Sequence, residues 1–443
     1  MSAIAEESEE VEEASARRPS WRSRLPWHRH APPTNKRQQR VLGVLGAANL
    51  VDNYDVAILG LALPQIQAGL HILDDQVGAV SAVIRLGVIP ALIVTALADG
   101  IGRRRLLLVT ILGFTLFTAL TSLAQTATQF MGLQFLARVF IAAEGILAVV
   151  VIAEVFDARN RGWGIGVVGA MGTLGHGVAS IVFAAVNILP FGWRSMYLLG
   201  VAPLLLLAWF RRSLEETHRF QQHRLTRAHA YDLNEALRPF RNLVRMYPGR
   251  LLAMGGALFP VAFLFETSSF FVPKTLQQVH GYTPAHVAAL YLSVGVVAPI
   301  GNVFAGLLGD RFGRKWVMIA GLILNAIAVW LFYNGSGALV PIGWALMIFT
   351  LTLVLVLFQA LGAELFPTSY RSTASGVRAV VGTLGAALGL VVEGVLYARF
   401  GSHSAAITAM LVVMPIAPLV TAFFLPETAS RELEEISPEK DVP

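Results

Sequence analysis

The sequence contains no cysteine and few charged residues. Asp, Glu, Lys and Arg together make up 14% of its 443 residues, whereas soluble globular proteins carry about 25%. Without cysteine the chain forms no disulfide, thiolate metal site or cysteine nucleophile. It also lacks the motif of a serine-hydrolase nucleophile or of a zinc protease. We therefore expect no enzyme, no cofactor and no metal site.

Long apolar runs take the place of charge. Hydrophobic residues make up 55% of the chain, and the mean hydropathy is +0.62. A helix that crosses a bilayer needs about 20 apolar residues. Suitable runs predict an all-α membrane protein with twelve transmembrane helices, near 41–66, 76–98, 104–124, 130–153, 162–186, 193–210, 249–272, 285–308, 316–333, 340–363, 372–398 and 403–425.

Four separated acidic sites repeat at almost one offset. Asp55 matches Glu266, Asp99 matches Asp310 and Glu216 matches Glu427, each 211 positions apart, while Glu154 matches Glu364 at 210. The repeat predicts two pseudo-symmetric six-helix bundles, 41–210 and 249–426. Residues 1–40 are predicted to be a disordered cytoplasmic tail, 211–248 a cytoplasmic linker with short surface helices, and 427–443 a second cytoplasmic tail. A parallel repeat in an apolar chain is typical of transporters.

The basic residues predict the orientation. Of the 34 Lys and Arg residues, 28 fall in the tails, the linker and the loops on their side, while the opposite loops hold only Arg194, Lys274 and Arg399. Because cytoplasmic loops are enriched in Lys and Arg, we expect both termini in the cytoplasm, in a bacterial inner (plasma) membrane. The net charge of +6 then reflects topology, and we expect no nucleic-acid partner.

Three motifs carry a family resemblance. They are Gly306-Leu-Leu-Gly-Asp-Arg-Phe-Gly-Arg-Lys315, Glu364-Leu-Phe-Pro-Thr-Ser-Tyr-Arg371 and Pro426-Glu-Thr428. Over about 41–430 the chain resembles the major facilitator superfamily, in particular its sugar and metabolite–proton symporters. The first copy of the loop motif departs from the family pattern at Thr95 and Gly100. The paired glutamines of the sugar porters are missing from 259–266, which argues against a hexose.

The resemblance implies secondary active transport by alternating access. Uptake of a small organic solute by proton symport is the first reading. A proton-coupled exporter of drugs or metabolites is the second, and a non-transporting membrane sensor is the third. The implied partners are the solute, protons and membrane lipid, and we expect a monomer. An organic acid, an aromatic metabolite and a cation all remain open as substrate.

The loop motif predicts a conformational latch. An aspartate at a helix end can accept hydrogen bonds from a neighbouring helix N-terminus, and the arginines can pair with Glu154 or Glu364. Such contacts would hold one state and break in the other; alternatively, the basic residues only enforce topology. The candidate residues are Asp99, Arg103, Arg104, Glu154, Arg161, Asp310, Arg311, Arg314, Glu364 and Arg371.

Charges inside apolar spans are candidates for function because they are costly to insert. Asp52 and Asp55 lie three apart, on one helix face, which Asn49 and Asn53 extend. Tyr54-Asp55 resembles the helix 1 site of proton-coupled sugar porters, in which the aspartate pairs with an arginine on helix 4. The resemblance implies that Asp55 and Arg138 form this proton-coupling pair, and the alternative is a static ion pair that fixes packing. Asp52 is a further proton-coupling candidate, unless it lies near the outer mouth, where it needs no special role.

Further intramembrane residues are candidates for substrate binding. His176 stands where sugar porters place a substrate-contacting glutamine, although a lone histidine can also be a packing residue. Glu266 is the repeat mate of Asp55, so it is expected to face the same cavity. The remaining candidates are Asn49, Asn53, Arg85, Glu144, Arg378 and Glu393.

Glycines at three- and four-residue spacing favour close helix packing. Residues 164–169 also match a dinucleotide-binding fingerprint, but no strand precedes them and glycines continue at 172 and 175,. With a similar series at 382–389, these glycines indicate ridges of small residues along which helices approach one another.

Overall fold

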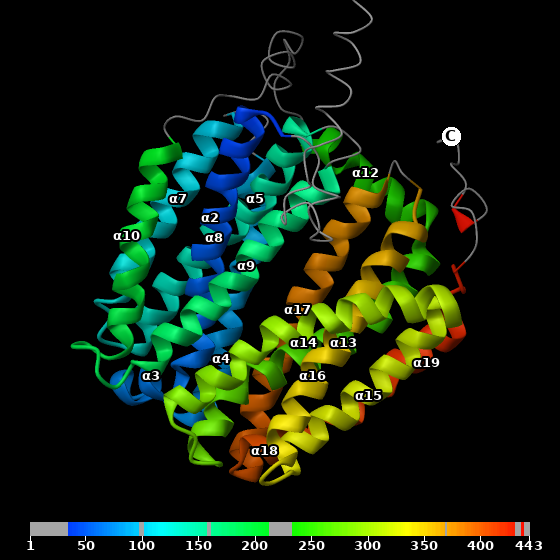
Figure 1. Ribbon diagram of the computed structural model, residues 1–443. Coiled ribbons are helices and arrows are strands. Elements are labelled where there is room, and N and C mark those ends of the chain that lie inside the picture. The colour runs from blue at the N-terminus through cyan, green and yellow to red at the C-terminus, as the bar shows by residue number, and fades with distance from the viewer. Residues whose placement is uncertain are drawn as a thin grey trace, which may run out of the picture.

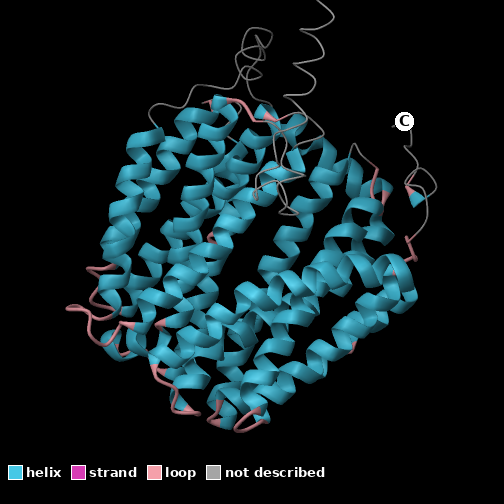
Figure 2. Ribbon diagram, in the orientation of Figure 1, coloured by secondary structure: helices cyan, strands magenta, loops and turns pink. Residues whose placement is uncertain are grey.

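The computed structural model describes residues 34–96, 102–156, 161–211, 233–367, 370–429 and 436–437. Within these ranges the chain is helical and contains no strand (Figure 2). Twelve helical spans are long and apolar enough to cross a membrane, which confirms the predicted number. In the predicted linker, α12 (Leu233–Met246) is a further helix.

The two halves are built from corresponding helices. In the first half, α4 and α5 form one span interrupted at Gly87, and α3 extends α2 after a short turn; in the second, α18, η3 and α19 form the last span. The first half contains α2 (Lys36–Leu61), α3 (Leu63–Leu70), α4 (Asp74–Leu86), α5 (Val88–Ala96), α7 (Arg103–Thr121), α8 (Ala127–Val155), α9 (Arg161–Ala184) and α10 (Trp193–Arg211). The second contains α13 (Pro248–Gln278), α14 (Pro284–Phe312), α15 (Arg314–Asn334), α16 (Leu339–Glu364), α17 (Arg371–Phe400), α18 (His403–Met410), η3 (Leu411–Val413) and α19 (Ile416–Phe424).

Glycine ridges hold equivalent helix pairs together within each half. In the first half α2 packs on α9, and in the second α13 packs on α17. A Cβ atom at Gly175 would lie 2.1 Å from the carbonyl oxygen of Leu50, and one at Gly389 would lie 2.1 Å from that of Phe263. Because no side chain fits at either site, the glycines permit the close approach. The predicted close packing is thus found at Gly172, Gly175, Gly385 and Gly389, whereas a Cβ at Gly166, Gly169 or Gly382 would have no atom within 4 Å.

The halves stand side by side and converge at the end away from the linker (Figure 1). Contacts between them run along α4 with α17 and α9 with α14, where a Cβ at Gly78 would lie 2.1 Å from the Leu390 carbonyl oxygen. At the converging end, the Gln65 amide donates to the Gln277 side-chain oxygen at 2.7 Å. We call this the closed end.

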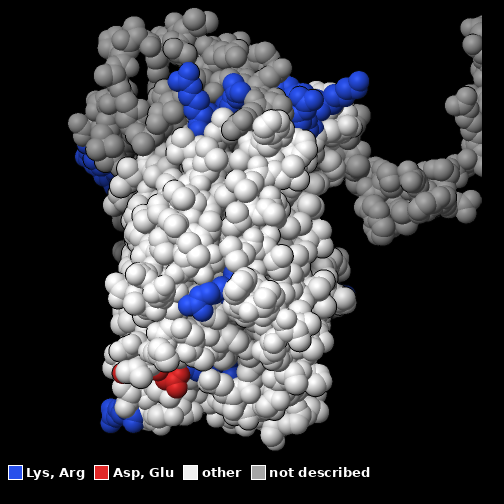
Figure 3. Space-filling view, turned by 90° about the vertical axis from the view of Figure 1, so that its left-hand side faces the viewer, with Lys and Arg blue, Asp and Glu red and all other residues white. Residues whose placement is uncertain are grey.

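The outer surface fits a bilayer. Many large apolar side chains of α7, α10, α14 and α15 are exposed, and Figure 3 shows a broad band almost free of charged side chains. On this face, most Lys and Arg side chains gather at the end that carries the linker. Together with twelve helices long enough to cross a membrane, an exposed apolar belt of this kind indicates a surface that contacts lipid.

Candidate functional site

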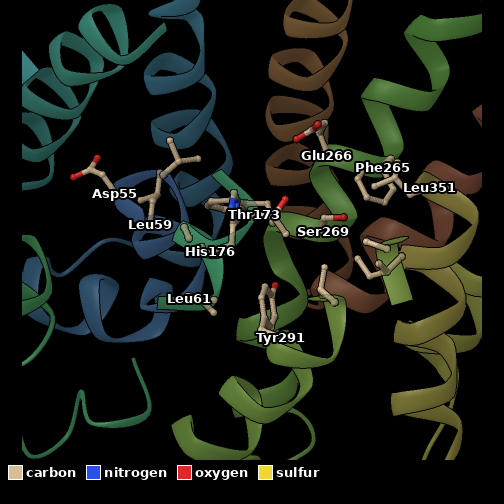
Figure 4. Close-up of a pocket in the computed structure, with 18 of the residues that line it drawn as sticks. Asp55, Leu59, Leu61, Thr173, His176, Phe265, Glu266, Ser269, Tyr291 and Leu351 are labelled. Atoms are coloured by element: carbon tan, nitrogen blue, oxygen red, sulfur yellow. The ribbon is translucent and has the colours of Figure 1, made fainter. Parts of the chain in front are cut away.

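A cavity of about 780 Å³ lies between the two halves. Its wall is formed by α2, α4, α8 and α9 of the first half and by α13, α14, α16 and α17 of the second. Figure 4 shows Asp55 and Glu266 on opposite sides, with His176 and Thr173 between them. The volume is within the usual range for small-molecule sites, about 300–1,000 Å³.

Most of the cavity wall is apolar, and one side of it is aromatic. Phe265 and Phe270 on α13, Tyr291 on α14 and Trp344 on α16 all line it. The rings of Tyr291 and Trp344 lie 4.9 Å apart, tilted by 32°. Flat aromatic faces of this kind favour a planar ligand.

One ion pair crosses the cavity between the halves. The Arg85 guanidinium on α4 lies 2.6 Å from the Glu266 carboxylate on α13. Their side chains are 23% and 42% exposed, so both reach the cavity. Arg85 comes just before the break at Gly87, and Glu266 lies between two helix prolines, Pro260 and Pro273. Both side chains therefore line the cavity, as expected for Glu266, while their role in substrate binding stays a prediction.

Asp55 is buried on the side of the first half. Its side chain is 3% exposed and accepts a hydrogen bond of 3.2 Å from the Thr118 hydroxyl. Arg138 lines the same cavity and is within electrostatic reach of Asp55, Asp52 and Glu266. The predicted Asp55–Arg138 ion pair is not formed in this structure, because the direct partner of the Asp55 carboxylate among the described residues is the Thr118 hydroxyl.

His176 also lines the cavity. Its Nδ1 lies 3.3 Å from the carbonyl oxygen of Gly172, one turn earlier in α9. This contact fixes the ring while leaving it against the cavity. The cavity thus brings together five of the predicted residues: Asp55, Arg85, Arg138, His176 and Glu266.

Six other candidates are described by the structure but do not line the cavity: Asn49, Asp52, Asn53, Glu144, Arg378 and Glu393. The Asn49 amide donates to the Val168 carbonyl at 2.7 Å, and the Asn53 amide donates to the Asn49 carbonyl at 2.8 Å. Asn49 therefore joins α2 to α9, whereas Asn53 forms its hydrogen bond within α2. Asp52 and Glu144 are buried, and Glu393 contacts His403 instead. Charge in a span indicates burial among protein groups, but it does not say on which helix face.

The loop motif forms ion pairs inside each half. Arg103 lies 3.2 Å from Glu154, and Arg314 pairs with Glu364 and, at 3.6 Å, with Asp310. These pairs follow the predicted pattern, while their role as a latch stays a prediction. Asp99 and the side chain of Arg161 lie outside the described residues.

A different acid accepts the helix N-terminus in the second half. Glu427 receives hydrogen bonds from the backbone N–H groups of Arg314 at 2.9 Å and Lys315 at 3.2 Å. Arg371 donates to the Phe366 carbonyl at 3.2 Å. Accepting hydrogen bonds from a helix N-terminus was predicted for the aspartate of the loop motif, but Glu427 does so here. Glu427 was identified as part of the repeat, and no role was predicted for it.

Sequence reasoning missed a charged cluster at the closed end. Lys274, predicted to lie in a loop, is inside α13, 1% exposed and paired with Asp74 of the first half. A run of apolar residues around Pro273-Lys274 was the available signal, but the predicted span ended at 272.

Both the sequence and the fold of this chain are similar to those of known proteins. The family model for the Major Facilitator Superfamily matches residues 45–301 and 254–441. The chain belongs to the Major Facilitator Superfamily. A "Probable 4-methylmuconolactone transporter" of Cupriavidus pinatubonensis is 27% identical over 434 residues, covering 93% of this chain and 95% of its own. A cis,cis-muconate transport protein of Acinetobacter baylyi is 26% identical, covering 86% and 92%.

Solved structures show the same fold. The crystal structure of a D-xylose–proton symporter aligns with a TM-score of 0.73 at 16% identity, covering 88% of this chain and 99% of that one. The protein is therefore a multi-pass integral membrane transporter with the major facilitator fold, and it is not an enzyme. Its relatives move small organic solutes.

Proposed function

We propose that this protein carries a small, planar organic carboxylate into the cell together with a proton. The observation that carries the proposal is the cavity between the halves, where two arginines stand beside two carboxylates in an aromatic chamber.

Arg85 is the group that recognises the anion. Its guanidinium already binds one carboxylate, that of Glu266, and arginine presents paired N–H donors that suit this group. The nearby rings of Phe265, Phe270 and Tyr291 supply flat apolar surface. Muconate is planar, unsaturated and carboxylated, so a relative that transports it supports the same class of substrate here.

Asp55 is the proton site. It is buried, lines the cavity and is attracted by Arg138. Protonation removes this attraction and changes the relative energies of the two states. One proton with a singly charged carboxylate moves no net charge across the membrane, so the pH gradient, worth about 1.4 kcal/mol per pH unit, drives accumulation. The alternative, a static charge that fixes packing, predicts that neutralising Asp55 leaves coupling intact.

The orientation rests on the basic residues. Most of them lie on the side of the linker, and Figure 3 shows Lys and Arg at that end. We place this end in the cytoplasm of a bacterial inner membrane. The closed end then faces outward, and the structure corresponds to the inward-facing state of alternating access.

Proteoliposomes test the proposal. We use cis,cis-muconate, because its two carboxylates prevent rapid passage through lipid. Valinomycin and equal K⁺ on both sides hold the membrane potential at zero, because one proton with this dianion still carries a net negative charge. With an acidic exterior, symport predicts accumulation above the external concentration, which a protonophore abolishes. Expulsion of preloaded muconate under the same gradient would instead support the exporter. No gradient-dependent movement, relative to protein-free liposomes, would contradict both.

A further inference from the structure

A second group of charges lies at the closed end, outside the cavity wall. Asp74 at the start of α4 contacts three helices of the other half. It pairs with Lys274 on α13, accepts a hydrogen bond of 2.9 Å from the Tyr397 hydroxyl on α17, and lies 3.9 Å from Nε2 of His403 on α18. One carboxylate thus joins the first half to the second.

The second carboxylate of the cluster is deeply buried. Glu393 on α17 is 0% exposed, and its Oε1 lies 2.6 Å from Nδ1 of His403. Its Oε2 has no hydrogen-bond partner among the described residues, and neither does Nε2 of His403, which points toward Asp74. Leaving a buried polar atom unpaired is costly. We therefore expect the His403–Glu393 pair to bind a further proton.

The charges of the cluster balance only with that proton. With His403 neutral, Asp74 and Glu393 carry two negative charges against the single positive charge of Lys274. A proton on the His403–Glu393 pair makes the sum zero, which favours burial. Protonated His403 has two N–H donors, one for Glu393 and one directed at Asp74.

The surroundings fix the ring and supply a path for the proton. Phe271 and Tyr397 stack on the two sides of His403, with ring centres at 4.5 and 4.2 Å. The Asp74 side chain is 40% exposed, whereas Glu393 is buried, so solvent at the closed end reaches the cluster through Asp74. The charged and titratable groups that face it are Asp74 and the exposed Asp75 on α4, Lys274 on α13, Tyr333 on α15, and Glu393 and Tyr397 on α17.

We propose that His403 and Glu393 form a second proton-binding site, separate from Asp55, whose proton holds the closed end shut through Asp74. Loss of the proton leaves the buried carboxylate of Glu393 and the partly exposed carboxylate of Asp74 to repel each other across the interface between the halves. The closed end then opens more readily. If the proposed orientation holds, acid outside the cell keeps the transporter inward-facing.

The distance between the halves provides a test that needs no substrate. The chain has no cysteine, so spin labels attach only at Ala68→Cys on α3 and Val279→Cys at the end of α13, both exposed. Pulsed electron–electron double resonance on the protein in nanodiscs measures the distance between the two labels. When the pH is raised from about 5 to about 8, we expect a population with a longer distance to grow.

Matched variants separate this site from other groups. Glu393→Gln balances the charges without a proton, so the labels should stay at the short distance at every pH. His403→Gln should raise the long-distance population at neutral pH. His286→Gln, an exposed histidine on α14 that bonds Thr283, should respond like the parent. An unchanged distance across the pH range in the parent, or the parent's full response in Glu393→Gln, would overturn the proposal.

Discussion

Replacing Arg85 should weaken the binding of a carboxylate and leave a neutral ester unaffected. A hydrogen bond to a charged group is worth about 1.5–3 kcal/mol. Arg85 is 23% exposed and its partner Glu266 is 42% exposed, so water screens the interaction and the lower part of this range applies. With a tenfold change in Kd for each 1.4 kcal/mol, Arg85→Gln should weaken muconate binding by about 10- to 30-fold.

Isothermal titration calorimetry of the purified protein measures the Kd for muconate. Muconate is compared with its dimethyl ester, which keeps the planar chain but carries no charge, and Arg85→Gln should bind the ester as the parent does. Arg378→Gln is the matched control, because Arg378 is an intramembrane arginine outside the cavity wall. Equal muconate affinities for the parent and Arg85→Gln, or an equal loss in Arg378→Gln, would refute Arg85 as the anion site.

Three other changes probe the coupling and the packing. Asp55→Asn should retain exchange of labelled for unlabelled muconate but lose gradient-driven accumulation, and unchanged accumulation would exclude Asp55 as the proton site. Gly175→Ala should lower the free energy of unfolding by about 1–3 kcal/mol through overpacking, because its Cβ would lie 2.1 Å from a carbonyl oxygen. Its melting temperature should therefore fall. Gly166→Ala is the control and should melt like the parent, because no atom lies within 4 Å of a Cβ there. Glu427→Ala removes the acceptor at the start of α15 and should cost about 0.5–2 kcal/mol; a melting temperature equal to the parent's would show that this contact contributes nothing.

The number of spans and the repeat were predictable because each is written in the order of residues along the chain, as an apolar length or as a motif that recurs at a fixed offset. Apolar length alone predicts a membrane helix, and an offset of 211 between Asp55 and Glu266 predicts that both face a shared space, as they do. The glycine spacing likewise predicted the close contact at Gly175.

Side-chain direction and contacts between halves were not predictable in this way. Asp52 and Asp55 share a helix face at three-residue spacing, yet only Asp55 lines the cavity, because a face is wider than the opening it borders. Asp74 and Lys274 are 200 residues apart. No local pattern connects them, since their contact depends on how the two halves dock.

Proton movement coupled to substrate tests the central claim most directly. Proteoliposomes are loaded with a pH-sensitive dye, the pH is set equal on both sides, and muconate is added outside. The account predicts that the lumen acidifies as muconate enters, and that the Asp55→Asn variant exchanges muconate without acidification. Net muconate entry through the parent protein with no change in the pH of the lumen would contradict the account.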